Sequence, residues 1–331
     1  MKYRPWGSID WALSLSAQHQ WQFVGVIGTE VRSLCAWRHM RQRKAIAGEL
    51  FAEIQDVDSE KYRERTEAAL TERRADFLQA GGSASAIRNF PLMAELYVVN
   101  AFANAAADMG SSLVLDITSF PKRFFFLILK TLIKNTGVRN LLVTYTSPSS
   151  YVDDGQPLYE DIEQWKTLPG YGGSSNKPEL WIVSVGFLVE SLRQYVGDNP
   201  NDKMKLLIPF PAPLSTLRRT WQSVSELEER HSQERFEKYR VDPLDISAAF
   251  DRITSLIGTP QRNVAFAPFG PKPTSVAMCL YAMQREDQSS AHYPQPTVYH
   301  PDYSIGIRKD DPSTAVNAYW IKHDGEFLYG L

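Results

Sequence analysis

The sequence is poor in cysteine and has no long apolar run, and both shortages narrow the class of protein. Only 2 of the 331 residues are cysteine, Cys35 and Cys279, and both occur in apolar, helix-like segments. We therefore expect buried thiols and no disulfide framework. The apolar runs are far shorter than the roughly 20 residues that cross a bilayer, and residues 1–6 lack the apolar core of a signal peptide. We expect a cytoplasmic protein with no membrane partner.

The sequence also lacks an excess of charge of either sign. Lys and Arg total 36 and Asp and Glu total 38, which gives a net charge of −2 and a pI near 6.3. Binding of bulk nucleic acid is not favoured, because the phosphate backbone attracts basic surfaces. A hydrophobic content of 43% and a charged content of 22% are typical of globular proteins. The length is sufficient for two domains of ordinary size.

Common catalytic and cofactor motifs are missing as well. The sequence contains neither Gly-x-Gly-x-x-Gly nor Gly-x-x-x-x-Gly-Lys-Ser/Thr, so a standard dinucleotide-binding fold and a P-loop ATPase are not expected. It has no His-Glu-x-x-His, its 6 histidines show no paired metal spacing, and no Gly-x-Ser-x-Gly nucleophile elbow occurs. We expect neither a metal site nor a cofactor.

What the sequence does contain is a pattern that occurs twice. Residues 23–34 (FVGVIGTEVRSL) resemble residues 181–192 (WIVSVGFLVESL), and residues 113–122 (LVLDITSFPK) resemble residues 264–272 (VAFAPFGPK). Recurrence in the same order at a nearly constant spacing indicates two copies of one unit, although apolar strands also resemble one another by chance. Two such halves could face each other across a shared cleft.

The order of elements predicts the fold class. Apolar strands alternate with helices in both halves, which predicts α/β architecture with two Rossmann-like halves, mainly parallel sheets and an internal duplication. A weaker third repeat joins residues 142–145 (LVTY) to residues 296–299 (PTVY), and we expect a strand at both places. At the C-terminus, Asp324 and Gly325 form the expected turn of a β-hairpin.

Composition also predicts the boundaries of the two halves. Residues 147–178 are rich in Gly, Pro and Ser. We therefore expect a first half at residues 1–150, a linker or loop at 151–178 and a second half at 179–331. Within these halves, helices are expected over residues 31–55 and over the charged segment 223–240.

Two turns that join a strand to a helix contain the dipeptide Pro-Lys, one in each half. In an open parallel sheet, ligands bind outside the carboxyl ends of the strands, and a helix start has unpaired N–H groups and partial positive charge that suit a phosphate. We expect an anion site at each turn, unless Ser119 and Thr274 only cap the helices and the lysines lie in solvent. The expected ligand-binding residues are Thr118, Ser119, Lys122, Arg123, Lys272, Thr274 and Ser275.

Four other residues are candidates for acid–base chemistry. Glu30 and Arg32 follow the first strand of the first half, and Asp116 lies at the end of a later strand. His300 lies in a loop that could reach the same cleft, and imidazole titrates near neutral pH. For Glu30 and Arg32, surface ion pairing is the alternative, so a catalytic role stays open.

The segment Asp116–Lys122, between an apolar strand and an apolar helix, resembles the strand–Thr/Ser–Lys–helix signature of CARF domains. These domains are Rossmann-like sensors of cyclic oligonucleotides in prokaryotic antiviral defence. Two such halves in one chain are similar to the SAVED domain, in which two CARF-like units form the ligand pocket. Phe120 and Pro121 stand where the family often has two glycines. The resemblance implies ligand contacts at Thr118, Ser119, Lys122 and Lys272.

These observations lead to three hypotheses about function. The first is a ligand-binding sensor or accessory protein that recognises a nucleotide or another phosphorylated small molecule between its halves. Because no effector domain is recognisable in the chain, such a sensor would act through a protein partner that carries the effector activity. The second hypothesis is an enzyme that acts on nucleotides or nucleic acid. The third is a scaffold subunit of a defence complex.

Overall fold

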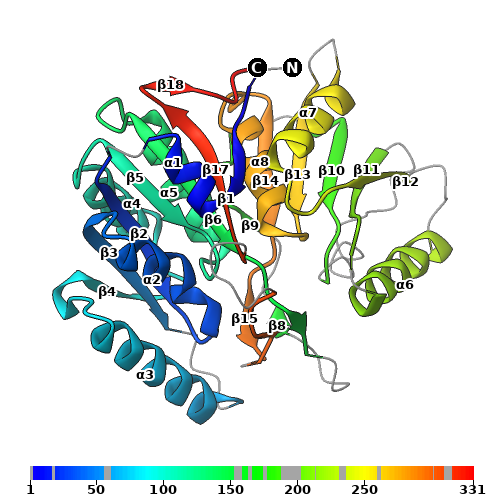
Figure 1. Ribbon diagram of the computed structural model, residues 1–331. Helices are drawn as coiled ribbons and strands as arrows, with labels where there is room; N and C mark the ends of the chain where they lie inside the picture. The colour runs from blue at the N-terminus through cyan, green and yellow to red at the C-terminus, as the bar shows by residue number, and fades with distance from the viewer. Residues whose placement is uncertain are drawn as a thin grey trace. The chain divides into compact units, whose positions relative to one another are not determined.

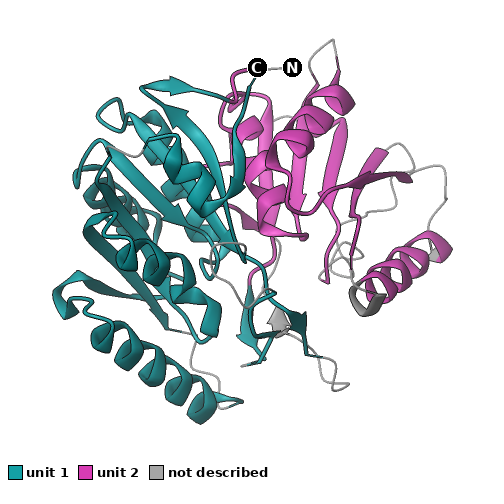
Figure 2. Cartoon of the chain, viewed as in Figure 1, with its two compact units in different colours: residues 1–162, 296–328 teal, residues 163–295, 329–331 magenta. Residues whose placement is uncertain are grey.

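The computed structural model divides the chain into two compact units (Figure 2). Unit 1 combines residues 1–162 with 296–328, and unit 2 combines residues 163–295 with 329–331. The described residues are 3–16, 19–55, 61–152, 159–162, 166–173, 177–187, 203–212, 214–230, 236–258, 262–300, 302–308 and 315–331.

Unit 1 is built on an eight-stranded sheet whose order is β1-β17-β6-β5-β2-β3-β4, with β18 paired to β17 (Figure 1). Its strands are β1 (Trp6–Ser8), β2 (Trp21–Ile27), β3 (Ile46–Gln55), β4 (Ile87–Pro91), β5 (Ser112–Asp116), β6 (Asn140–Thr146), β17 (Val316–His323) and β18 (Glu326–Phe327). The helices are α1 (Ile9–Ser14), η1 (Val31–Leu34), α2 (Cys35–Gln42), α3 (Arg63–Gln79), η2 (Ala84–Ala86), α4 (Leu96–Ala107) and α5 (Lys122–Lys134).

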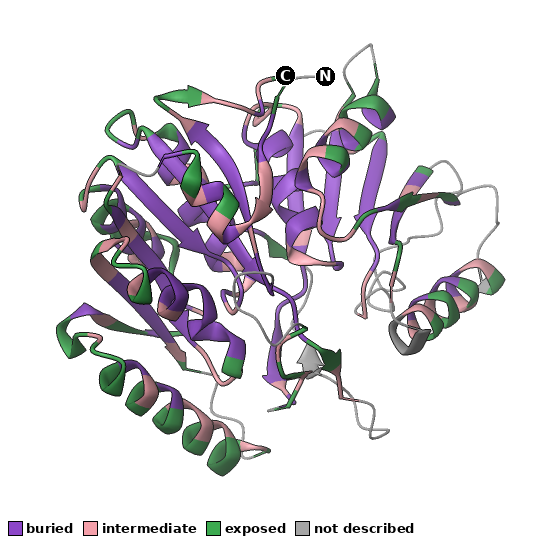
Figure 3. Cartoon of the chain, viewed as in Figure 1, coloured by how far each residue is buried: buried purple, intermediate pink, exposed green. Residues whose placement is uncertain are grey.

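Five neighbouring strands of this sheet, from β4 at its edge through β3, β2 and β5 to β6, are parallel. From β2 the chain moves outward through β3 to β4, and it then returns to the other side of β2 as β5 and β6. β17 closes the sheet antiparallel to β6, and β1 is antiparallel to β17. β5 and β6 are buried along their whole length (Figure 3), which agrees with their nearly continuous apolar sequence.

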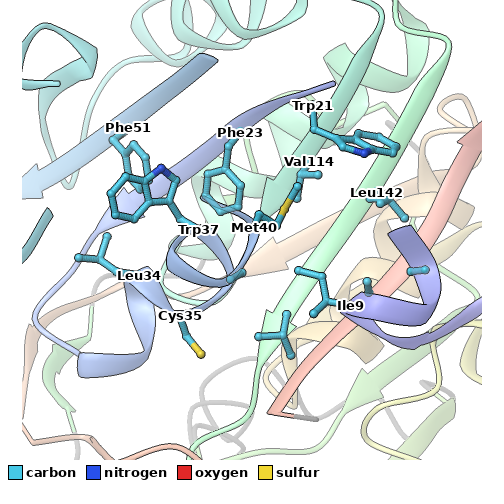
Figure 4. Close-up of a cluster of buried hydrophobic side chains, with 14 of the residues drawn as sticks. Ile9, Trp21, Phe23, Leu34, Cys35, Trp37, Met40, Phe51, Val114 and Leu142 are labelled. Carbon is cyan, nitrogen blue, oxygen red and sulfur yellow. The ribbon is translucent and has the colours of Figure 1, made fainter. Parts of the chain in front are cut away.

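One face of the sheet is covered by α1, α2 and α3 and is rich in aromatic residues (Figure 4). The ring of Phe51 on β3 stacks with Phe23 on β2 at 5.7 Å between centroids, and Phe77 of α3 packs 4.7 Å from Phe51. Trp37 of α2 lies 4.7 Å from Phe77. A Cβ at Gly25 would lie 2.8 Å from the Phe23 ring and 2.9 Å from the Phe51 ring, so glycine is the residue that leaves room for this stack.

The opposite face carries α4 and α5. Here Phe90 of β4 packs edge-on against Phe102 of α4 at 5.3 Å, and Phe102 packs against Phe120 at 6.3 Å. The helix α5 is apolar on most of its surface, and nine of its thirteen residues are buried. Unit 1 is therefore a sheet covered by helices on both faces, the architecture that parallel strands require.

Short strand pairs from distant parts of the chain complete unit 1. β7 (Ser150–Tyr151) pairs antiparallel with β16 (Ser304–Ile305), and β8 (Tyr159–Ile162) pairs antiparallel with β15 (Pro296–Tyr299). At the C-terminus, Lys322 pairs with Phe327 across a turn in which Asp324 and Gly325 have positive φ. These pairings fasten residues 296–328 to the first unit.

Unit 2 contains a six-stranded sheet with the order β12-β11-β10-β13-β14-β9. Its strands are β9 (Lys166–Thr167), β10 (Leu180–Ser184), β11 (Lys203–Pro209), β12 (Phe236–Val241), β13 (Val264–Pro268) and β14 (Ser289–Tyr293). Its helices are α6 (Leu214–Arg230), α7 (Ile246–Ile257) and α8 (Lys272–Ala282). All strands except β9 are parallel.

The two units share one strand order. Numbered along the chain within each unit, the five parallel strands lie in the order 3-2-1-4-5, and an antiparallel strand follows the fifth strand in both. This is the Rossmann-type arrangement that the alternating pattern predicts, so the α/β class with mainly parallel sheets is confirmed. A shared order is what an internal duplication would give, and the duplication itself stays a prediction.

The prediction of one helix over residues 31–55 is wrong in its second part. α2 ends at Gln42, and Lys44 adopts a positive φ of 55° that turns the chain. Residues 46–55 then form β3, paired in parallel with β2 and β4. Ala, Glu and Leu in this segment favour helix locally, but hydrogen bonding to the strands on either side, β2 and β4, outweighs this preference.

Two further expectations in the second half are corrected by the strand pairing. The charged helix ends at Arg230, and residues 236–241 form the edge strand β12. Residues 296–299 do form a strand, but it pairs with β8 in unit 1, and the fifth parallel strand of unit 2 is β14. The division of the chain also differs from the expected halves, because residues 296–328 return to unit 1.

The remaining expectations from composition concern thiols and membranes. Cys35 and Cys279 are both buried and neither is in a disulfide, as predicted. Among the helices that the structure describes, none combines the length and apolar character that a membrane span needs.

Truncation of Phe77 tests whether the aromatic cluster holds α3 on the sheet. Phe77 is fully buried against Trp37 and Phe51, so Phe77→Ala should lower the free energy of unfolding by about 3–5 kcal/mol. The neighbouring Leu78 is 42% exposed, and Leu78→Ala should change it by less than about 1 kcal/mol. Urea denaturation of both variants measures the difference, and equal losses would contradict this account of the core.

A second prediction concerns His292 on β14. Its ring centroid lies 5.5 Å from that of Trp181, and its Nε2 lies 2.8 Å from the hydroxyl oxygen of Ser290. Burial lowers the pKa of His292 to about 4. In the unfolded chain, the imidazole of His292 takes up a proton below about pH 6.5, whereas in the folded chain it does so only near pH 4. The stability that the neutral, buried ring contributes is therefore present above pH 6.5 and is lost as the pH falls towards 4. Between pH 7 and pH 4.5, wild type should lose roughly 2 kcal/mol more than His292→Gln in urea denaturation. Equal losses of stability in wild type and in His292→Gln would show that the ring has the same pKa in the folded and unfolded states.

Candidate functional sites at the strand ends

Each sheet has a point where the chain reverses its direction of travel across the sheet. In unit 1 this switch point lies between β2 and β5, and in unit 2 between β10 and β13. Ligands of open α/β sheets bind outside the carboxyl ends of the strands at such a point. The Pro-Lys turns after β5 and β13 are located there, at the start of α5 and of α8.

In unit 1 the two turns at the switch point touch each other. A Cβ at Gly28 would lie 3.0 Å from the Cβ of Ser119, so only a glycine fits there without a shift of its neighbour. The hydroxyl of Ser119 donates a hydrogen bond to Glu30 Oε2 at 3.1 Å. The predicted ligand residue Ser119 and the predicted acid Glu30 are thus brought together, and they bind one another.

Arg32 completes a polar network around Glu30. Its guanidinium pairs with Glu30 Oε1 at 2.9 Å, donates to the carbonyl of Thr146 at 2.7 Å and donates to the hydroxyl of Ser304 at 3.1 Å. The hydroxyl of Ser304 in turn donates to Glu30. Burial, the largest influence, lowers the pKa of Arg32, but Glu30 and the nearby Tyr145 raise it to a net value above the ordinary one. Arg32 is only 4% exposed, so this pair is a buried one and differs from the surface ion pair of the alternative interpretation.

Asp116 lies in a second network, at the ends of β5 and β6. Its Oδ1 accepts hydrogen bonds from the amide of Thr118 at 3.2 Å and from the hydroxyl of Thr144 at 3.2 Å, and the Thr118 hydroxyl bonds to the same oxygen at 2.5 Å. Thr118 Oγ1 also accepts from the amide of Thr146 at 2.9 Å. These bonds give Asp116 and Thr118 a role in fastening two strand ends.

Cys35, at the start of α2, lies near these networks. Burial, and secondly the charge of Asp116, raise the pKa of the Cys35 thiol to about 11. The thiol is therefore protonated at neutral pH, and a thiol in that state is a poor nucleophile.

The Pro-Lys turn of unit 1 begins α5 as predicted. Pro121 is the N-cap residue, and no side chain caps the helix. Lys122 is the first helical residue and is 8% exposed. Arg123 is directed to the loop between β4 and α4, where it contacts Met93 Sδ at 2.9 Å and the carbonyl of Ala94 at 2.9 Å.

His300 lies in the segment that returns from unit 2 to unit 1. It is 4% exposed, its ring is 5.3 Å from that of Tyr62, and its Nδ1 accepts the amide of Asp302 at 3.1 Å. These contacts are with Tyr62, the N-cap residue of α3, and with its own loop. No contact described for His300 involves Glu30 or Asp116.

In unit 2 the switch point is built from glycines and a buried hydroxyl. A Cβ at Gly186 would lie 2.1 Å from the carbonyl oxygen of Phe269, and a Cβ at Gly270 would lie 2.1 Å from Ser184 Oγ. Ser184 ends β10, so its hydroxyl is aimed at the turn that begins α8. Among the described residues this hydroxyl has no hydrogen-bond partner, although Ser184 is fully buried.

The start of α8 repeats the geometry of α5. Pro271 is the N-cap residue with no side-chain cap, and Lys272, which is half-buried, is the first helical residue. Thr274 is 1% exposed, and its hydroxyl also has no hydrogen-bond partner in the described part of the chain. Ser275 donates to the carbonyl of Pro271 at 3.1 Å. Neither Ser119 nor Thr274 is the N-cap residue of its helix, so the capping alternative is wrong for both.

Sequence reasoning missed an aromatic residue on the same edge of this sheet. Phe210 directly follows β11, is 44% exposed, and has the guanidinium of Arg240, at the end of β12, 4.7 Å from its ring centroid. The amide of Phe210 donates to the carbonyl of Val241 at 2.8 Å, which fixes the backbone of Phe210 beside the end of β12. The available signal was a large aromatic residue immediately after a buried strand.

Within the described residues, no group of three or more His, Cys, Asp and Glu side chains could hold a metal ion.

Comparisons with known proteins add little to this geometry. No protein-family model matches the chain, and no curated protein matches it. Among solved structures, the chain is similar to a putative universal stress protein from Pseudomonas aeruginosa UCBPP-PA14, with 11% sequence identity and a TM-score of 0.25, over 83% of this chain and 93% of that chain. A TM-score this low does not establish a shared fold or function.

The Glu30–Arg32 network makes a direct prediction about stability. Arg32→Met leaves the carboxylate of Glu30 without its buried partner and should lower the free energy of unfolding by about 3–5 kcal/mol. The double variant Glu30→Gln/Arg32→Met removes both charges, so it should be more stable than Arg32→Met alone. Urea denaturation checks both values. Equal or additive losses in the double variant would show that the two side chains do not depend on each other.

Proposed function

We propose that this protein is a ligand-binding sensor that recognises a mononucleotide, or a similar phosphorylated small molecule, at the carboxyl edge of the unit 2 sheet. Lys272 and the first N–H groups of α8 hold the phosphate, and Phe210 with Arg240 holds the base. In this proposal a separate protein partner supplies the effector activity. The resemblance to CARF and SAVED domains supports the sensor class, and antiviral defence is the setting that it implies.

The observation that carries the proposal is the start of α8, which no side chain caps, beside the buried hydroxyl of Ser184, which has no hydrogen-bond partner in the described part of the chain. An unsatisfied buried hydroxyl costs about 1–3 kcal/mol, and a phosphate oxygen would remove this cost for Ser184. Because a Cβ at Gly270 would lie only 2.1 Å from Ser184 Oγ, the glycine turn covers the hydroxyl closely. A ligand that reaches Ser184 must therefore displace this turn, whereas Lys272 lies at the partly exposed rim.

The strand register supports a ligand that is long enough to include a base. Leu207 of β11 and Pro268 of β13 both pair with Ser184 of β10, so β10 and β13 end at the same level and β11 continues for two more residues, to Pro209. Phe210 follows β11 and Lys272 follows the turn after β13, and these two strands are two strand spacings apart, which is about 10 Å. A base stacked on Phe210 and a phosphate at Lys272 would span such a distance. Stacking on an aromatic ring contributes about 1–3 kcal/mol.

The corresponding edge of unit 1 is less suited to an anion. There the carboxylate of Glu30 lies beside Ser119, and the hydroxyls of Ser119 and Thr118 are engaged within the protein. A phosphate would have to compete with this half-buried carboxylate. This contrast favours unit 2 for the proposed site. The shared cleft between the halves stays a prediction from the sequence.

Isothermal titration of the purified protein with AMP, GMP, CMP and UMP tests the proposal. At least one of them should bind, and more tightly than its nucleoside. Lys272→Ala should weaken that binding about tenfold or more through loss of a charge-assisted contact. Phe210→Ala should weaken nucleotide binding at least about fivefold and leave the binding of ribose 5-phosphate unchanged. Lys203→Ala, at the amino end of β11, is the matched control and should have no effect.

Three outcomes would overturn the proposal or change its class. Nucleotide affinity that survives Lys272→Ala unchanged contradicts the proposed phosphate site. Affinity that is lost with Lys122→Ala and retained with Lys272→Ala moves the site to unit 1. Conversion of the nucleotide to a new product during the titration, measured by chromatography, replaces the sensor with an enzyme.

A further inference from the structure

A groove in unit 1, whose lining contains none of the switch-point residues, runs along an open edge of β3. β4 pairs only with the second half of β3, beginning with Ile87 opposite Phe51. Residues 46–50 form the first half of β3 and pair with β2 on the other side, except at Ala47, where the register shifts by one residue. The groove has a volume of about 580 Å³, and all five of these residues line it. We call it the β3-edge groove.

The lining shows that this groove follows a strand edge. Arg41 comes from α2 on one face of the sheet, whereas Ala105 and Met109 come from α4 and the turn after it on the opposite face. A groove bordered by helices from both faces lies between them, beside the strand. In a parallel pair, alternate residues of β3 direct their N–H and C=O groups away from β2, and these groups point into the groove.

The side chains around the groove leave the edge accessible to another backbone. Most of the lining residues are small, and no bulky aromatic residue is among them: Ala47, Gly48, Gly81, Ser83, Ser85, Ala86 and Ala105. An open edge of five residues is about 16 Å long. Such an edge is a template for an added strand.

The charge at the groove favours an acidic occupant. The only lining acid is Glu49, which is engaged by the indole of Trp37 at 2.7 Å, by Arg41 at 3.3 Å and by the amide of Ser83 at 2.9 Å. The exposed guanidinium of Arg88 bonds to backbone carbonyls, those of Ser85 at 2.7 Å and Ile87 at 3.1 Å. Two arginines against one internally satisfied carboxylate leave the rim positive.

We propose that the β3-edge groove binds an extended, acidic peptide segment of a partner protein, which adds a strand to the first half of β3. Backbone hydrogen bonds to residues 46–50 supply affinity, and carboxylates of the peptide pair with Arg88 and Arg41. The segment occupies the position that a longer β4 would fill. This inference does not depend on the proposed nucleotide site.

A phage-displayed library of random octapeptides, selected against the purified protein, tests the groove. Selected peptides should be enriched in Asp and Glu and in β-forming residues. Fluorescence polarisation with the best selected peptide should show at least a tenfold loss of affinity in Ala105→Trp, which fills the exposed floor of the groove. Asn104→Trp is the matched control, since Asn104 is exposed on the same helix and does not line the groove.

Charge and backbone are tested separately with the same peptide. Arg88→Glu should weaken binding of the peptide at least fivefold. Asn89 is the next residue on β4 and is also exposed, and Asn89→Glu should leave the binding unchanged. Hydrogen exchange of residues 46–50 should slow on binding. The proposal is overturned by selection of no peptide, by peptides that bind Ala105→Trp equally well, or by unchanged exchange at residues 46–50. The protein without peptide could also dimerise. If Ala105→Trp abolishes this dimer and the peptide does not compete with it, the groove binds a second copy of the chain, and the proposal of a partner peptide is overturned.

Discussion

Parallel pairing between the first and fourth strands of each unit is the constraint on which the candidate sites depend. When β2 lies beside β5, and β10 beside β13, the turns that follow these strands leave the sheet at one edge and must pass each other closely. Glycine is required at the end of each first strand, since a Cβ at Gly28 would approach Ser119 and a Cβ at Gly186 would meet the backbone of Phe269. The same pairing places the start of α5 and of α8 at the switch points, with their partial positive charge.

The two units satisfy this constraint with different chemistry. Unit 1 places its own carboxylate, Glu30, at the edge and balances it with Arg32, so most polar groups there are engaged with each other. Unit 2 places the hydroxyls of Ser184 and Thr274 there without hydrogen-bond partners among the described residues. One strand order therefore supports a structural network in one unit and a candidate binding edge in the other, which agrees with the rule that function depends on the site more than on the fold.

The sequence predicts the parts of this structure that depend on local pattern. Buried parallel strands are continuous apolar runs, so β2, β5, β10 and β13 were recognisable, and so were the Pro-Lys helix starts. β3 and β12 were missed because their residues favour helix or are charged, and only pairing with neighbouring strands makes them strands. Ser304 bonds to Glu30 across most of the chain length, and no local pattern indicates such a contact. Phe210 likewise acquires its neighbour Arg240 only when β11 and β12 pair.

The central claim is that the unit 2 edge binds a phosphorylated ligand and the unit 1 edge does not. Amide NMR spectra of the isotope-labelled protein, recorded with and without the tightest-binding mononucleotide, test it most directly. The account predicts chemical-shift changes at Ser184, at Gly270 and Lys272, and at Phe210, with little change at Glu30 and Ser119. Shift changes concentrated at Glu30, Ser119 and Lys122, or no changes at either edge, would contradict it.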